Sequence, residues 1–150
     1  MRNIHEVFTE VGDEKSINRK VQLLKDNDSP GVRSVLRGTF DKRLKWLLPD
    51  TVPPYEKTEE VDWNECKFKL ENAATTSFFY YVEFNGRIPN EARKMNKVQR
   101  ERLFIEMIEK LHEDEVKLVF SMLQRKLPYK GLTARVANKA FPGLIPEEFE

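Results

Sequence analysis

The chain has 150 residues, the length of one globular domain. Hydrophobic residues make up 39% of it and charged residues 34%, and 26 Lys and Arg nearly balance 25 Asp and Glu. This composition excludes a disordered chain, and the short apolar runs exclude a membrane-spanning helix.

The N-terminal part of the chain is predicted to form four short helices. Apolar residues recur three and four positions apart in each of them, which gives every helix one buried face. The four faces are Ile4, Val7, Phe8 and Val11; Ile17, Val21 and Leu24; Val32, Val35 and Leu36; and Phe40, Leu44 and Leu47. Ser29 and Pro30 mark the start of the third helix, because serine caps a helix and proline suits its first turn. Pro49 ends the fourth helix.

The middle of the chain is predicted to hold an exposed connection and then a long buried helix. Residues 49–60 contain Pro53 and Pro54, which cannot continue a helix. The buried helix is placed at residues 62–84. Its end, residues 78–84, is aromatic enough for a strand, but the sequence offers no second strand to pair with it, and a lone strand is unstable.

Three more helices are predicted after a loop at residues 87–95. Asn96 caps the first of them and Thr133 caps the last. His112 precedes the second as a helix-start residue, and the acids at 113–115 suit its first turn, where the helix dipole favours negative charge. Their inner faces are Phe104, Met107, Ile108 and Leu111; Val116, Val119, Phe120, Leu123 and Leu127; and Val136, Ala137, Ala140 and Phe141. Residues 1–150 are therefore predicted to be one compact all-α domain, a bundle of about seven or eight short helices.

The sequence lacks the common signatures of catalysis and cofactor binding. It has no phosphate-binding glycine loop and no nucleophile elbow, and its two histidines, His5 and His112, lack partners at metal-ligand spacing. The single cysteine, Cys66, excludes an internal disulfide and suits a reducing cytoplasm. Its thiol would be a nucleophile only if a distant base reached it, so an inert, half-buried thiol is the simpler interpretation. We predict a cytoplasmic protein that is not an enzyme and that holds no metal or other cofactor.

Charge is unevenly distributed along the chain. Residues 15–47 hold nine Lys or Arg and three acids, a formal charge of +6, and residues 87–142 hold thirteen and seven, again +6. Residues 48–72 carry a formal charge of −4. Two basic segments around an acidic middle predict a molecule with one positive face, and a solvated surface of mixed charge is the alternative.

Several basic residues lie at predicted helix starts or at a tight turn. Free backbone N–H groups and the helix dipole favour an anion at a helix start. The positions are Asn96, Lys97 and Arg100; Lys126, Lys130, Thr133 and Arg135; and, at the turn, Asp41, Lys42 and Arg43. Together they predict a surface that binds the phosphate backbone of a nucleic acid and reads little of its sequence.

Residues 132–147, LTARVANKAFPGLIPE, resemble the end of the N-terminal helical DNA-binding domain of ATP-dependent DNA ligases of the T-even phage type. The similarity extends to residues 113–127 and to the opening helices within residues 4–44. It covers most of the chain but is specific mainly in the last fifteen matched residues, and residues 49–96 match poorly and contain an insertion. The sequence is also similar to small uncharacterised proteins of tailed phages.

The ligase resemblance implies an all-helical module that grips double-stranded DNA through the minor groove and the backbone, largely without sequence preference. It implies DNA contacts at Thr39, Lys42 and Arg43; at Lys130, Gly131 and Thr133; and at Arg135 and Lys139, with Asn96 and Lys97 matched by position only. In ligases a nucleotidyltransferase domain follows, with a Lys-x-Asp-Gly motif whose lysine takes AMP. That motif does not occur here, so the resemblance implies DNA binding without adenylation.

Two other interpretations stay open. The chain could be a protein-interaction module of phage origin that binds a replication, repair, host or defence protein. Its candidate contacts are the acidic run at residues 147–150 and the loop at residues 49–62 with Tyr55, together with Trp63. The chain could also be a piece of a longer ligase. The predicted partner remains double-stranded DNA, intact or nicked, with no membrane partner.

Overall fold

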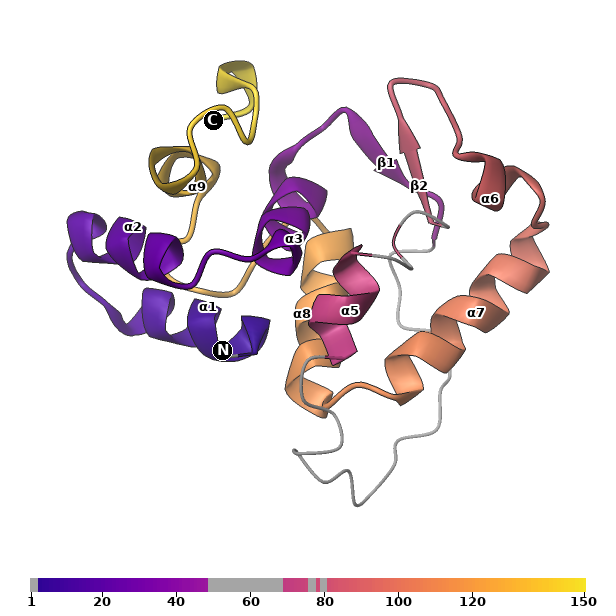
Figure 1. The fold of residues 1–150 in the computed structure, drawn as a ribbon, viewed down its shortest axis with the longest axis horizontal. Helices are drawn as coiled ribbons and strands as arrows, with labels where there is room; N and C mark the ends of the chain where they lie inside the picture. The colour runs from indigo at the N-terminus through magenta and orange to yellow at the C-terminus, as the bar shows by residue number, and fades with distance from the viewer. Residues whose placement is uncertain (1–2, 49–68, 76–77, 79–80) are drawn as a thin grey trace.

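The computed structural model describes residues 3–48, 69–75, 78 and 81–150. It is mostly helical, as predicted, with one two-stranded antiparallel sheet (Figure 1). The elements are α1 (Ile4–Asp13), α2 (Ile17–Asp26), α3 (Pro30–Phe40), β1 (Leu44–Trp46), α5 (Lys69–Thr75), β2 (Val82–Phe84), α6 (Asn90–Arg93), α7 (Lys97–Glu109), α8 (Glu113–Leu123), α9 (Ala134–Ala140) and a 3-10 helix (Glu147–Phe149). Within these ranges, no helix has both the length and the apolarity needed to cross a membrane.

The core forms where α3 and α8 meet in the middle of the molecule. α3 packs against α5 and α8, α1 packs against α2 and α8, and α2 packs against α9. Figure 1 shows α1, α2 and α9 at one end of the long axis, and α6, α7 and the strands toward the other. Large side chains from several of these helices, among them Phe8, Leu36, Phe104 and Leu118, are almost completely buried. The apolar stripes therefore pack into one shared core.

The predicted helix starts at Ser29, Asn96 and Thr133 are confirmed. In each case the side-chain oxygen accepts a hydrogen bond from the backbone N–H three residues further on. His112 is also a helix-start residue, as predicted, because its Nδ1 accepts from the Asp114 N–H at 3.2 Å. These ends follow from local chemistry, which the sequence alone displays.

The predicted fourth helix is wrong, and so is the end of the predicted helix at residues 62–84, where residues 82–84 form a strand. α3 ends at Phe40, and the residues that follow form β1, which pairs with β2 so that Leu44 lies opposite Phe84 and Trp46 opposite Val82. A strand of three residues has too few positions to show alternation. Its partner lies in a distant part of the sequence, so the pairing has no local signal.

The small sheet is stable because it packs on the rest of the protein. The Trp46 indole donates to the Gly38 carbonyl at 2.8 Å and packs edge-on against the ring of Phe78, with centroids 5.5 Å apart. An isolated pair of strands would be marginal in water, and this packing supplies the missing stabilisation. Of the predicted helix at residues 62–84, the described part contains α5, and the connection at residues 49–60 lies outside the described residues.

Two smaller boundaries also differ from the prediction. α6 interrupts the predicted loop at residues 87–95, and α8 ends at Leu123, before Leu127. Arg125 has a backbone φ of 64°, which places it in the left-handed region and ends the helix there.

Candidate nucleic-acid interface

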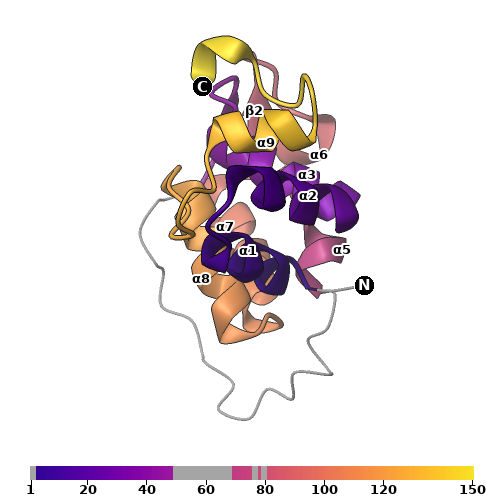
Figure 2. The ribbon, with the colours of Figure 1, turned by 90° about the vertical axis from the view of Figure 1, so that its left-hand side faces the viewer.

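Three of the predicted DNA-binding residues line one hollow in the surface. Arg43 comes from the turn between α3 and β1, and Arg135 and Lys139 come from α9. The hollow is open, has a volume of about 570 Å³, and is lined on its other side by Pro142, Gly143, Ile145, Pro146, Glu147 and Glu150. Figures 1 and 2 both show α9 with the C-terminal segment on its outer side. We call Arg43, Arg135 and Lys139 the α9 cluster.

The sequence of α9 explains how its two cations reach the same hollow. Arg135 and Lys139 are four residues apart, so they project from one face of the helix, and both are exposed. Asn138, between them, donates from Nδ2 to the Ile145 carbonyl and accepts at Oδ1 from the Ile145 N–H, both at 2.8 Å. This pair of bonds folds the turn after α9 back onto the helix. It also brings Glu150 close, since Asn138 Nδ2 lies 3.2 Å from Glu150 Oε2.

The turn that carries Arg43 is built around a buried carboxylate. The Asp41 side chain is fully buried and accepts two hydrogen bonds from the Arg43 guanidinium, at 3.0 and 2.8 Å, while Arg37 lies 3.8 Å away. Burial alone would raise the pKa of Asp41, but the bonds from Arg43 and the charge of Arg37 outweigh it and lower the pKa below its ordinary value. Arg43 is thus held in one direction while its side chain stays 37% exposed.

Arg125 fixes the same turn from the end of α8. Its guanidinium donates to the carbonyls of Gly38, at 3.3 Å, and Asp41, at 2.9 Å, and also to the carbonyl of Leu44. Burial lowers the pKa of Arg125, with Asp41 acting in the opposite direction. No sequence signal singles out Arg125, because its partners are backbone atoms that no motif marks.

Lys42 is exposed beside the α9 cluster. Its ammonium lies 5.9 Å from the centre of the Phe149 ring, and both residues line a second hollow of about 360 Å³. Phe149 itself packs against the core as a half-buried side chain. Phe149 therefore contributes to the fold, which makes it a weaker candidate for a contact with a protein partner.

Two predicted contact residues have structural roles, Thr39 as a buried residue and Gly131 as an exposed one. Thr39 is only 1% exposed and its hydroxyl donates to the Val35 carbonyl, so it cannot reach DNA in this conformation. Gly131 has a φ of +75° and lies against the buried Lys20 side chain, whose ammonium donates to the carbonyls of Val11 and Lys130. The Gly131 turn is therefore a packing site between α2 and the segment before α9.

The start of α7 does not join the α9 cluster. Figure 1 shows it at the opposite end of the long axis from α9. Asn96 and Gln99 already satisfy each other's backbone N–H groups, and Arg100 donates to the carbonyls of Ala92 and Met95. Only Lys97 is left exposed there as a free-standing cation of the predicted set. The expectation that the helix starts converge on one polyanion is wrong for α7.

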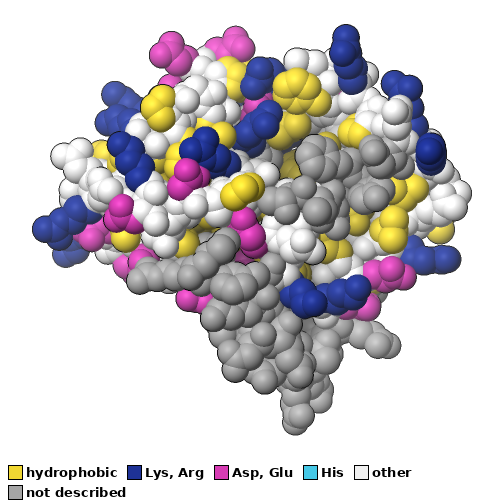
Figure 3. Space-filling model, in the orientation of Figure 1, with side chains coloured by type: hydrophobic (Ala, Val, Ile, Leu, Met, Phe, Trp, Pro, Cys, Tyr) yellow, Lys and Arg dark blue, Asp and Glu magenta, His cyan; other side chains and the backbone are white. Residues whose placement is uncertain are grey.

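The remaining predicted residues are exposed but do not line the hollow. Lys126 and Lys130 lie between α8 and α9, and Thr133 uses its hydroxyl to cap α9. On the face drawn in Figure 3, Lys and Arg side chains are spread widely with acids among them, and no single continuous patch forms. Of the predicted residues, Arg43, Arg135 and Lys139 share the first hollow, and Thr39 and Lys42 share the second.

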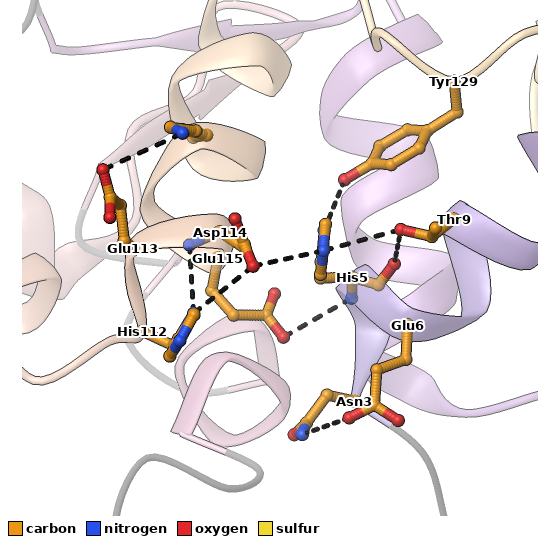
Figure 4. A network of polar contacts seen from close by, with 10 residues as sticks. Asn3, His5, Glu6, Thr9, His112, Glu113, Asp114, Glu115 and Tyr129 are labelled. Atoms are coloured by element: carbon orange, nitrogen blue, oxygen red, sulfur yellow. Dashed lines mark hydrogen bonds and ion pairs between the residues drawn. The ribbon is translucent and has the colours of Figure 1, made fainter. Parts of the chain in front are cut away.

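A second group of polar residues connects α1 to the start of α8 (Figure 4). His5 Nε2 and His112 Nδ1 both lie 3.6 Å from the same oxygen, Asp114 Oδ2. His5 Nδ1 is also 3.0 Å from the Tyr129 hydroxyl, and the His5 N–H lies 3.4 Å from Glu115 Oε1. No sequence signal joins these positions, because only the packing of α1 on α8 brings them together. Among the described residues, no group of His, Cys, Asp and Glu is arranged to hold a metal ion.

The family model described as "Family of unknown function (DUF6433)" matches residues 7–129. The chain belongs to this family. No curated protein matches it. The matched range runs from α1 through α8 to Tyr129 and stops before α9. The family description names no function, so the similarity to ligase DNA-binding domains stays a prediction, and the function has to be argued from the surface.

Proposed function

We propose that the protein is a non-catalytic module that binds the phosphate backbone of double-stranded DNA at the α9 cluster. The observation that carries this proposal is that cations from two distant segments, Arg43 on one side and Arg135 and Lys139 on the other, line one open hollow. Arginine and lysine are the main phosphate ligands in protein–DNA contacts. The resemblance to the ligase domain supports the same surface, because it independently points to these three residues.

The chemistry of the α9 cluster suits a phosphate oxygen. Arg43 uses its Nε and one Nη for Asp41, which leaves N–H groups of the same guanidinium for an incoming anion. Because Asp41 fixes that guanidinium, Arg43 loses little side-chain freedom on binding. Arg135 and Lys139 are exposed, long side chains that can follow the backbone of the duplex.

Acids in the same hollow limit the strength of the interaction. Glu147 and Glu150 line it with the three cations, so the local surplus of positive charge is small. We therefore propose weak, salt-sensitive binding without base readout, in the range of about 10⁻⁴ to 10⁻⁶ M at physiological salt. Three phosphate contacts would give a slope of log K against log salt of about −3.

The test is a titration of a fluorescent duplex, intact or nicked, followed by anisotropy at several salt concentrations. The double variant Arg135→Ala/Lys139→Ala is expected to bind at least about tenfold more weakly, with a slope nearer −1. The matched control, Lys97→Ala/Arg102→Ala, removes the same charge from exposed positions of α7 and should bind within about twofold of the parent. Equal losses in both variants would mean that binding is diffuse, and no binding at low salt would reject the proposal.

Removing the negative charges of Glu147 and Glu150 gives a second test, in which the affinity for DNA is expected to rise. The variant Glu147→Gln/Glu150→Gln keeps the side-chain length and the oxygen that Asn138 contacts, but it removes two negative charges from the hollow. Duplex binding is expected to become about threefold to tenfold tighter, with the gain shrinking at high salt. Unchanged affinity for the duplex would mean that DNA binds at another surface.

A second candidate function, a protein-interaction module, would be supported by a different result. In that case the chain would not bind DNA, and it would capture a protein partner that stays bound after nuclease treatment.

A further inference from the structure

Both histidines of the chain meet at one carboxylate. His5 comes from α1, and His112 caps α8, yet each imidazole has a nitrogen 3.6 Å from Asp114 Oδ2 (Figure 4). When protonated, either imidazole forms an ion pair with Asp114. The pair with His5 crosses from α1 to α8, so the charge of that ring directly affects how these two helices hold together.

A buried acid lies directly beside this pair. Glu115 is only 3% exposed; its Oε1 lies 3.4 Å from the His5 N–H, and its Oε2 has no hydrogen-bond partner within the described part of the chain. Burial raises the pKa of Glu115 to about 7, and the nearby charges of Glu6 and Asp114 act in the same direction against the hydrogen bond from His5. A proton on this carboxyl removes a buried charge from the junction.

The other groups around the junction do not neutralise it. On α1, Glu6 accepts a hydrogen bond from Asn3 and adds negative charge. After α8, the Tyr129 hydroxyl contacts His5, and burial together with the nearby acids raises its pKa, so it stays uncharged near neutral pH. On α8, Glu113 and Lys117 pair with each other at 3.8 Å on the exposed side. The junction therefore combines His5, His112, Asp114 and Glu115 with the negative charge of Glu6 beside them.

We propose that these four residues make the contact between α1 and α8 pH-sensitive, so that α1 is held most firmly in mildly acidic solution and loosens as the pH rises through neutrality. The His5–Asp114 ion pair and the ionisation of Glu115 both act in this direction. A proton on His112 Nδ1, by contrast, would gain the pair with Asp114 but end its hydrogen bond from the Asp114 N–H. The ion pair of His5 with Asp114 exists only while the imidazole carries a second proton. As the pH rises through neutrality, Glu115 gains a buried negative charge beside Asp114. The device does not depend on the proposed DNA binding.

Amide hydrogen exchange of α1, corrected for the intrinsic effect of pH, tests this proposal on the whole chain. Between about pH 5.5 and about pH 8, the protection of α1 is expected to fall at least tenfold. Glu115→Gln keeps the Oε1 acceptor but cannot ionise, so its protection should fall less than about threefold over that range. The control Glu113→Gln makes the same change in the same helical turn, outside the four-residue cluster, and should keep the parent's pH profile.

Asp114→Asn is the second variant, and it removes the carboxylate that both histidines share. In this variant we expect the α1 amides to lose protection from hydrogen exchange mainly near pH 5.5, where α1 of the parent is most protected. The pattern is opposite for Glu115→Gln, which is expected to differ from the parent mainly near pH 8. Identical profiles for the parent and both cluster variants would overturn the proposal. A change of equal size in Glu113→Gln would do the same, because the effect would then belong to the helix dipole.

Discussion

Replacement of Arg125 by methionine is expected to lower the free energy of unfolding by about 2–3 kcal/mol, a large effect for one partly exposed side chain. Arg125 donates to the carbonyls of Gly38, Asp41 and Leu44, and it thereby ties the end of α8 to the turn after α3. Gly38 keeps the Trp46 indole as a donor and Asp41 keeps the Leu44 N–H, so the cost falls mainly on the Leu44 carbonyl and on the lost link between α8 and the turn. Methionine fills similar space and adopts the same backbone, so the loss reports the hydrogen bonds.

The same substitution should also weaken DNA binding if the proposed surface is correct. The turn that Arg125 holds carries Arg43, so a looser turn spreads the guanidinium over more positions.

Urea denaturation followed by circular dichroism measures the stability, and Arg135→Met is the matched control, since it changes an exposed arginine and should cost less than about 0.5 kcal/mol. Equal stabilities of the two variants would contradict the structural role of Arg125.

Gly131→Ala is expected to cost about 2–3 kcal/mol of stability. Gly131 has a φ of +75°, which disfavours any residue with a Cβ. In addition, a Cβ would lie 2.8 Å from Cε and 3.1 Å from Nζ of Lys20, so the buried ammonium would have to move. Its bonds to the carbonyls of Val11 and Lys130, at 2.6 and 2.9 Å, would then lengthen or break. The contact between α1, α2 and the segment before α9 would weaken with them.

The variant Gly143→Ala separates the cost of backbone strain from the cost of the contact with Lys20. Gly143 has nearly the same φ, +80°, but nothing lies within 4 Å of the position its Cβ would take. Its replacement should therefore cost only the conformational strain, about 1 kcal/mol. The difference between the two glycine variants in the same denaturation experiment measures the Lys20 contact. If both substitutions cost the same, Lys20 has room to adjust and the packing role of Gly131 is smaller than the structure indicates.

Helix positions were the most predictable part of the fold. The apolar faces of α1, α3 and α8 and the caps at Ser29, Asn96 and Thr133 follow from spacing and side-chain chemistry within one or two turns. The sheet was not predictable in this way. β1 and β2 have three residues each, and what stabilises them is their pairing and the contact of Trp46 with Phe78.

The candidate site was also predictable only in part. The exposed cations Arg135 and Lys139 could be identified from the sequence, because their spacing of four places them on one face of a helix. Thr39 and Gly131 carry the same implied role, yet the first is buried and the second packs on Lys20. Burial depends on what the rest of the chain places against a residue, and a motif does not contain that information.

By itself, the sequence determined the starts and the apolar faces of most of the helices, since these depend on contacts between near neighbours along the chain. Only the tertiary structure decided that Arg43 shares a hollow with α9, that the start of α7 lies elsewhere, and that His5 and His112 meet at Asp114. These arrangements depend on how helices pack across large separations in sequence. That packing is set by the whole core, and no local pattern records it.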